Sequence, residues 1–230
     1  MNQVPPMDET ANAAASMDGN HSSMQQLLTS APARLVHPQR IVSCYEDALT
    51  LDVAVKLQAC DRVQPQLALL VAEQFGLAQS SALLDLAPED LALMRLAPAQ
   101  LDELVVIAGA AYWAHVFAAE IRTSEVALMK QAIGEAAFKF ALANRDLAGH
   151  LAHPGSTDNL IAAVRRDGLH CIGSWHASLP GGLAGWARLK HASDKEVQPF
   201  AEEAQRALGL AIMNRLAADL DLMASEETAQ

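Results

Sequence analysis

Histidine and cysteine side chains in the second half of the chain are the residues best suited to bind a metal. They are His150, His153, His170, Cys171, His176 and His191. A zinc site requires three or four ligands whose spacing brings them together. His150 and His153 are three residues apart, but Pro154 and Gly155 follow at once, and the neighbours His170 and Cys171 project about 100° apart on a helix. No HExxH pattern completes the set, so we expect no metal site and histidines that lie on the surface or cap helices.

Cys171 is also the thiol with histidines near it in sequence, which makes it the candidate nucleophile. A catalytic thiol requires a positioned base, whereas His176 lies five residues later and projects onto a different face of a helix. We therefore expect a buried, inert Cys171 beside Trp175. The segment PGGLAGW follows no strand and lacks the Lys-Ser/Thr pair of a phosphate-binding loop, which favours a flexible connector. Glu202 and Glu203 adjoin other charged residues and indicate a solvated helix face.

These patterns predict no catalytic residue and no cofactor, and they favour a binding protein over an enzyme. A small helical metalloenzyme that uses the histidine group is a competing hypothesis. The composition predicts the fold class: 51% of the 230 residues are hydrophobic and 4% are aromatic, with alanine and leucine dominant. Both are strong helix formers, and no series of alternating β-branched residues indicates strands. We expect an all-α protein, a single compact domain of about six to eight helices.

The most apolar stretch, LVVIAGAAYWAHVFAAEI, runs from Leu104 to Ile121. Between Leu104 and Ala119 the only polar side chain is His115. These residues, about 16 in number, span roughly 24 Å as a helix, whereas a bilayer core of about 30 Å requires about 20. We therefore expect this stretch to lie at the centre of a folded core, with no direct membrane insertion.

Charge and cysteine usage limit the partners and the compartment. Sixteen basic and 27 acidic residues give a net charge of −11, which disfavours nucleic acid and anionic lipid surfaces. Three widely spaced cysteines without a CxxC pair indicate reduced thiols in the cytoplasm. The N-terminus has no basic and apolar signal pattern. We expect a disordered polar tail over 1–28, the helical domain over 29–223 and a flexible C-terminal tail over 224–230.

Proline, glycine and periodicity suggest where the helices begin and end. Pro38 prevents one helix across 31–41, Gly76 is a stop signal, and the hydroxyls of Thr123 and Ser124 suggest a helix start. The helix that starts at Thr123 should form a hairpin with the apolar one before it. We expect helices over 45–60 and 61–76, from Pro88, from Pro98 through the apolar stretch, over 123–144, from Thr157 and from near Pro199.

Several segments, in the same order and at similar spacing, resemble the type III secretion K family (SctK, the Yop translocation protein K group). They are PARLVHP from Pro32, VQPQLALLVAEQFGL, LAPAQLDELVVIAGAAYWA with Gly109 inside it, AAVRRDGLHCIGSW with Gly168-Leu169, and GWARLKHA from Gly185. The arginine before Gly168 and Arg188 depart from the family's offsets. The resemblance covers roughly Pro32 to Leu220, outside the first thirty residues.

The resemblance implies a non-catalytic cytosolic adaptor of the injectisome sorting platform, peripheral to the inner membrane through the secretion apparatus. Such a protein links the cytoplasmic domain of the ring protein SctD to the pod protein SctQ, with the stator protein SctL as a further candidate partner. The alternative is a secretion chaperone or regulator that binds export substrates in an apolar groove. Because arginine and tryptophan dominate many interfaces, the candidate partner-binding residues are Arg165, Arg166, Trp186, Arg188 and Lys190, with a core position for Trp186 as the alternative.

Overall fold

The chain folds entirely into helices in the part that the structure describes. The structure is a computed structural model that describes residues 30–46, 48–77, 86–149, 155–193 and 197–228, with side chains as far as residue 220. Eleven α-helices and three short 3₁₀ turns occupy these ranges, without a strand. The predicted all-α class is confirmed, whereas the predicted tail over 1–28 lies outside the described residues.

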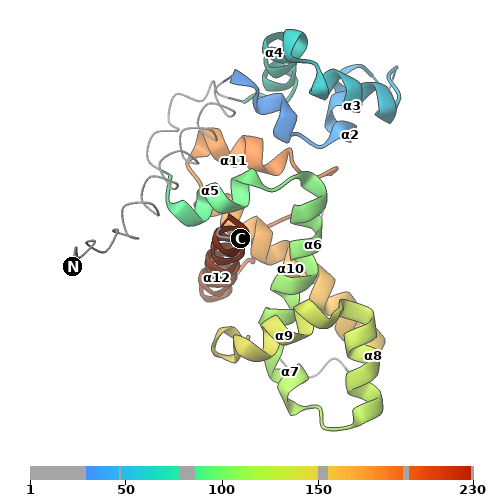
Figure 1. The fold of residues 1–230 in the computed structure, drawn as a ribbon, viewed down its shortest axis with the longest axis vertical. Coiled ribbons are helices and arrows are strands. Elements are labelled where there is room, and N and C mark those ends of the chain that lie inside the picture. Colours follow the sequence, from blue (N-terminus) through green and yellow to red (C-terminus); the bar gives the residue numbers. More distant parts are fainter. Residues whose placement is uncertain (1–29, 47, 78–85, 150–154, 194–196, 229–230) are drawn as a thin grey trace, which may run out of the picture.

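The helices form an elongated molecule with two apolar clusters (Figure 1). The N-terminal lobe, residues 30–77, contains η1 (Pro32–Leu35), α2 (Pro38–Cys44), α3 (Leu51–Ala59), η2 (Asp61–Val63) and α4 (Gln64–Gln74). The body, the described residues from 86 onward, contains α5 (Pro88–Arg95), α6 (Pro98–Tyr112), α7 (Ala114–Ala119), α8 (Thr123–Ile133), α9 (Glu135–Ala143), η3 (Arg145–Leu147), α10 (Thr157–Ser178), α11 (Gly181–Arg188) and α12 (Glu203–Thr228). The lobe lies at one end of the molecule, and α7, α8 and α9 lie at the other (Figure 1).

The apolar stretch is a core segment, as expected, but it is not one helix. It divides at Trp113 into α6 and α7, and the next expected helix divides at Gly134, whose φ of 88° interrupts α8 and α9. These two breaks, together with α2 and α11, which were not expected as helices, bring the described α-helices to eleven against the expected six to eight. No helix in the described ranges has the length and apolar character that a membrane span requires.

Several helix ends follow the sequence signals and others do not. Pro88 and Pro98 open α5 and α6, and Gly76, with a φ of 61°, follows α4, all as predicted. The helix predicted over 45–60 is α3, which begins later than expected because Thr50 caps it by accepting from the Val53 amide, and α2, which ends at Cys44, is a separate helix before it. The predicted connector PGGLAGW is wrong, since residues 181–188 form α11.

Two further boundaries differ from expectation. Neither Thr123 nor Ser124 caps α8, because Arg122 occupies the cap position and its side chain makes no capping bond. α12 begins at Glu203 rather than near Pro199 and continues to Thr228. The predicted flexible tail is therefore helical over 224–228, where the chain contains neither glycine nor proline to end the helix.

The tightest contact of the body is the crossing of α6 and α10 at two glycines. A Cβ on Gly109 would lie 1.8 Å from the carbonyl oxygen of Val164, and a Cβ on Gly168 would lie 1.9 Å from that of Val105. Each glycine thus accepts the backbone of the opposite helix in the space where any other residue carries a side chain. A glycine inside a helix costs about 1 kcal/mol relative to alanine, and close packing of the two helices offsets that cost.

Gly109→Ala and Gly168→Ala should each lower the free energy of unfolding by more than about 2 kcal/mol, because the added methyl group forces the helices apart. Urea denaturation followed by circular dichroism measures the change. Gly182→Ala in the first turn of α11 is the matched control, since a Cβ there meets no atom within 4 Å. That control should be neutral or slightly stabilising. Equal effects at all three positions would contradict the role of the crossing.

Candidate functional site

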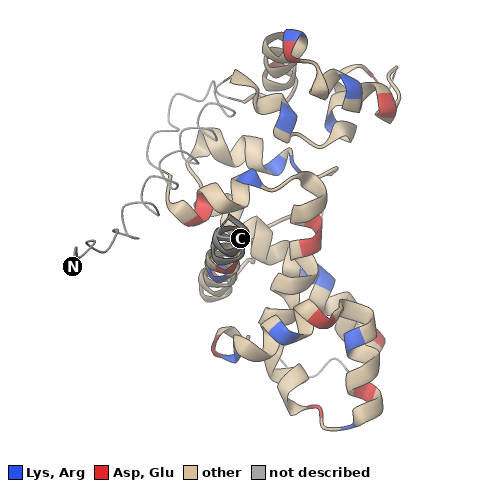
Figure 2. Cartoon of the chain, viewed as in Figure 1, with Lys and Arg blue, Asp and Glu red and all other residues tan. Residues whose placement is uncertain are grey.

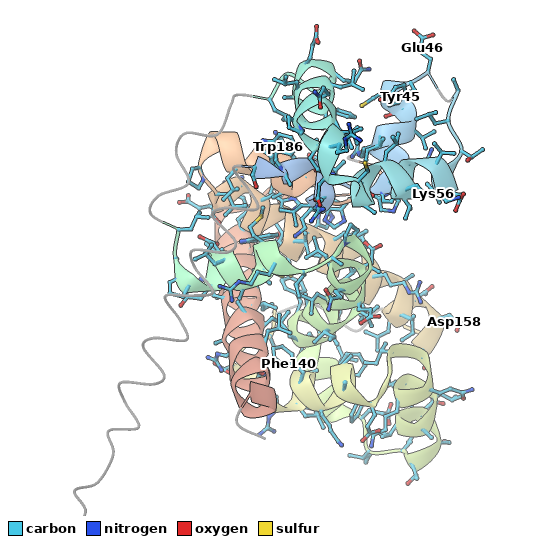
Figure 3. All side chains as sticks on the ribbon, turned by 45° about the horizontal axis from the view of Figure 1, so that its top comes forward. Tyr45, Glu46, Lys56, Phe140, Asp158 and Trp186 are labelled. Atoms are coloured by element: carbon cyan, nitrogen blue, oxygen red, sulfur yellow. The ribbon has the colours of Figure 1, made fainter. Side chains whose placement is uncertain are left out.

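α11 joins the N-terminal lobe to the body, and the residues after it are the most unusual in the chain. Trp186 and Leu189 belong to the apolar cluster of the lobe, not to that of the body. The amide of His37 donates to the carbonyl of Leu189 at 2.8 Å, and Arg40 Nε donates to the carbonyl of His191 at 2.8 Å. Figure 3 shows Trp186, which belongs to α11, on the opposite side of the lobe from Tyr45 and Lys56. We call the group Arg40, His176, Lys190 and His191 the lobe–body seam.

Lys190 is fully buried in the seam and acts as a cap for α5. Its Nζ donates to the carbonyl of Met94 at 2.6 Å and to that of Leu93 at 3.4 Å. Both carbonyls lie in the last turn of the helix, where a cation is favourable, and that of Leu93 also accepts from the Leu96 amide at 3.3 Å. Burial lowers the pKa of Lys190 to about 7. The side chain therefore holds α5 and α11 together at the cost of an ionisable group in the interior.

A second buried polar group lies beside the glycine crossing. The indole Nε1 of Trp113 donates to Asp167 Oδ2 at 2.8 Å, and the guanidinium of Arg166 donates to both oxygens of the same carboxylate at 2.8 and 2.9 Å. Asp167 is 3% exposed. Its charge is compensated by these donors, so the cluster locks the break between α6 and α7 onto α10. This cluster has a structural role.

The five candidate partner-binding residues fall into two groups. Trp186 and Lys190 are buried, the first in the lobe cluster and the second against α5, so neither offers a contact surface in this structure. Their burial corrects the expectation that both bind a partner directly. Arg165, Arg166 and Arg188 are exposed, although Arg166 is already paired with Asp167. Figure 2 shows acidic and basic residues distributed over both lobe and body rather than gathered on one element.

The exposed large apolar side chains belong to elements at the two ends of the molecule. Eight large hydrophobic residues are exposed among the described ones, and they lie in either the lobe or the segment α7–α9. The lobe group is Tyr45, Leu51, Val53, Val55 and Leu69, and the far-end group is Ile121, Leu128 and Leu142. Solvent-exposed groups of this kind mark contact surfaces when they cluster. The sequence patterns did not single out these residues, because an apolar residue on a short helix looks the same whether it faces core or solvent.

One member of the far-end group, Ile121, lies in a hydrogen-bonded turn between α7 and α8. The backbone amide and guanidinium of Arg122 donate to Glu120, and these bonds lower the pKa of the Glu120 carboxyl to about 2. Between the two charged residues stands Ile121, whose side chain is 90% exposed. Thr157 Oγ1 also donates to Glu125 Oε2 at 2.9 Å and ties α8 to the start of α10. An apolar side chain held outward in this way needs little ordering on binding.

The histidines and cysteines do not assemble as a catalytic set in the described ranges. His150 and His153 lie outside the described residues. His170 Nδ1 lies 2.7 Å from the Gln198 carbonyl oxygen, while His176 and His191 meet in the seam. Cys171 is fully buried, and burial raises the pKa of its thiol. No group of three potential metal ligands occurs among the residues that the structure describes.

Comparisons with protein-family models, with curated proteins and with solved structures found no match for the chain.

The three thiols should differ in reactivity. Cys60 is exposed, Cys44 is half-buried with a pKa raised by burial, and Cys171 is buried. Because the thiolate is the reactive form, the native protein should react quickly with about one equivalent of a disulfide reagent, at Cys60, and slowly with a second, at Cys44. The third thiol, Cys171, should react only in denaturant. The Cys60→Ser variant should lose the fast phase. A fast phase that survives this substitution would contradict the assignment.

Proposed function

We propose that this chain is a non-catalytic adaptor of a type III secretion sorting platform, which links the cytoplasmic domain of SctD to the pod protein SctQ. The proposal rests on the resemblance of five segments to the SctK family and on the arrangement of those segments. The protein would be cytoplasmic and would reach the inner membrane through its partners. SctL is a further candidate partner.

The segments that carry the resemblance contact one another in pairs. LAPAQLDELVVIAGAAYWA contributes Gly109 and AAVRRDGLHCIGSW contributes Gly168, and these two glycines meet at the α6–α10 crossing. PARLVHP contributes His37 and GWARLKHA contributes Leu189, which share a backbone hydrogen bond. Segments far apart in sequence thus form one framework. This is the arrangement expected if they are the shared structural positions of a family.

The separation of the two exposed apolar groups is the observation that carries the bridging role. A linker between two proteins requires two contact surfaces that can be occupied together and a rigid connection between them. The lobe group and the far-end group lie at opposite ends of the molecule (Figure 1). The glycine crossing and the Trp113–Asp167 bond stiffen the part between them. Each end therefore offers one partner an apolar contact.

Co-purification from cells that express all secretion components tests the proposal. Wild-type chain should recover SctQ and the cytoplasmic domain of SctD. Leu51→Asp with Val55→Asp, at the lobe, should lose one of these proteins, and Ile121→Asp with Leu128→Asp, at the far end, should lose the other. Desolvating a new carboxylate in an apolar contact is unfavourable, so a loss of at least about tenfold in recovery is expected.

Ala162→Asp is the control, because it adds an aspartate at an exposed position of α10 between the ends. It should leave both partners bound. Recovery of neither partner by wild-type chain, or recovery of both by the two end variants, would overturn the proposal. Strong binding of isolated export substrates in place of these partners would favour the secretion chaperone.

A further inference from the structure

The lobe–body seam buries two imidazole rings that the proposed adaptor role does not require. His176 and His191 are 3% and 4% exposed, and their ring centroids lie 5.4 Å apart. Both ring nitrogens of His176, and Nε2 of His191, have no hydrogen-bond partner among the described residues. Buried polar atoms are nearly always paired in folded proteins. The pair is therefore a weak point of the packing, and it is linked to the lobe through the backbone carbonyl of His191, which accepts from Arg40.

The surroundings of His176 oppose its protonation. Burial is the main reason that its pKa lies well below the usual value. The neighbouring charges act in the same direction, since His191, Lys190 and Arg188 all face the ring and no acidic group offsets them. A proton on this imidazole would be an unpaired charge in the interior, next to other cations.

His191 has the same burial but a mixed set of neighbours. Burial lowers its pKa, and Lys190 and Arg40 lower it further, against the attraction of Asp102, whose Oδ1 lies 3.6 Å from His191 Nδ1. Asp102 is largely exposed and also faces His37 at the edge of the seam. The exposed carboxylate of Asp102 therefore interacts with both His37 and His191, and its single negative charge cannot neutralise a proton on both His176 and His191.

The hydrogen bonds that attach the lobe to the body have their acceptors close to this histidine pair. His37 donates to the carbonyl of Leu189, and Arg40 donates to the carbonyl of His191 itself. The carbonyl acceptors stand at either side of Lys190, in the segment that carries one of the two imidazoles. A change at the rings is therefore transmitted directly to the residues that fix the lobe.

We propose that His176 and His191 form a proton-sensitive latch, whose protonation in mild acid releases the N-terminal lobe from the body while the α6–α10 crossing stays intact. In the closed form both rings are neutral. In the released form water hydrates them, and their pKa values return to about 6.5. The released form then binds more protons below about pH 6.5, so the closed form loses stability as the pH falls through this window.

The size of the effect follows from the same linkage. A histidine that stays neutral in the closed form multiplies the ratio of released to closed form by about ten between about pH 7.5 and about pH 5.5. His176 meets this condition, and His191, where Asp102 opposes the lowering of the pKa, adds at most a further factor of about ten. Lys190, with a pKa of about 7, adds little in the acidic part of this window, because it is then protonated in both forms. The latch needs no partner protein, so its test is independent of the adaptor role.

Hydrogen exchange on the full chain, read by mass spectrometry and corrected for intrinsic rates, tests the latch. Protection of amides in α2 and α4 should fall by about ten- to a hundredfold between about pH 7.5 and about pH 5.5. Protection in α6 and α10 should persist. The double variant His176→Phe with His191→Phe should retain a protected lobe at both pH values, since its rings do not titrate and the carbonyl at position 191 is unchanged.

His170→Gln is the matched control, because His170 bonds to the Gln198 carbonyl outside the seam. It should keep the acid response of wild type. The latch is overturned by unchanged lobe protection in wild type, by equal loss in lobe and body, or by a full acid response in the double variant. Wild-type NMR gives a second measurement: the His176 and His191 ring signals should titrate together with the lobe amides, and titration without a lobe change overturns the proposal.

Discussion

The backbone contact between α6 and α10 at Gly109 and Gly168 is the constraint on which the rest of the body depends. Because neither helix carries a side chain at the crossing, the two axes approach closely enough for Asp167, the neighbour of Gly168, to accept the indole proton of Trp113. That bond holds the chain where α6 gives way to α7, and so sets the direction in which α7, α8 and α9 leave the crossing. A methyl group at either glycine would therefore disturb more than the local packing, since it would also separate Trp113 from Asp167.

α11 is a second constraint, and it works through polar as well as apolar contacts. Trp186 and Leu189 face the lobe cluster, whereas the next residue, Lys190, reaches the carbonyls at the end of α5. A leucine or methionine in place of Lys190 would fill the space but remove the 2.6 Å hydrogen bond to the Met94 carbonyl. The buried cation therefore fixes a single arrangement of α5 and α11 at a cost in burial free energy. The seam holds its shape through a few directed bonds, which makes it sensitive to protons in a way that the glycine crossing is not.

The sequence predicted the helical class, the proline starts of α5 and α6 and the stop at Gly76, because each depends on local backbone chemistry.

Sequence-based predictions failed where tertiary contacts decide the outcome. PGGLAGW has the composition of a connector but forms α11, whose Trp186 and Leu183 are buried on packing. The buried role of Lys190 was missed and that of Trp186 was left open, since a segment with one tryptophan and two basic residues has the same composition in a core as at an interface. Pairing of Gly109 with Gly168 could not be inferred from either helix alone. The exposed apolar groups became visible only once the burial of each side chain was known.

Rigidity is distributed unevenly along the molecule, and this bears on what a bridging protein could do with it. Between the crossing and the far end, backbone contact and the Trp113–Asp167 bond join the elements. Between the crossing and the lobe, the connection passes through buried histidines and a lysine with a pKa of about 7. A partner bound at the far end would therefore keep a fixed orientation relative to the α6–α10 crossing. The orientation of a partner bound at the lobe would depend on whether the lobe–body seam is closed or released. A partner that binds the closed lobe better than the released one would also stabilise the closed form by the same differential free energy, as linkage requires. Assembly at the lobe and protonation of the seam would then oppose each other.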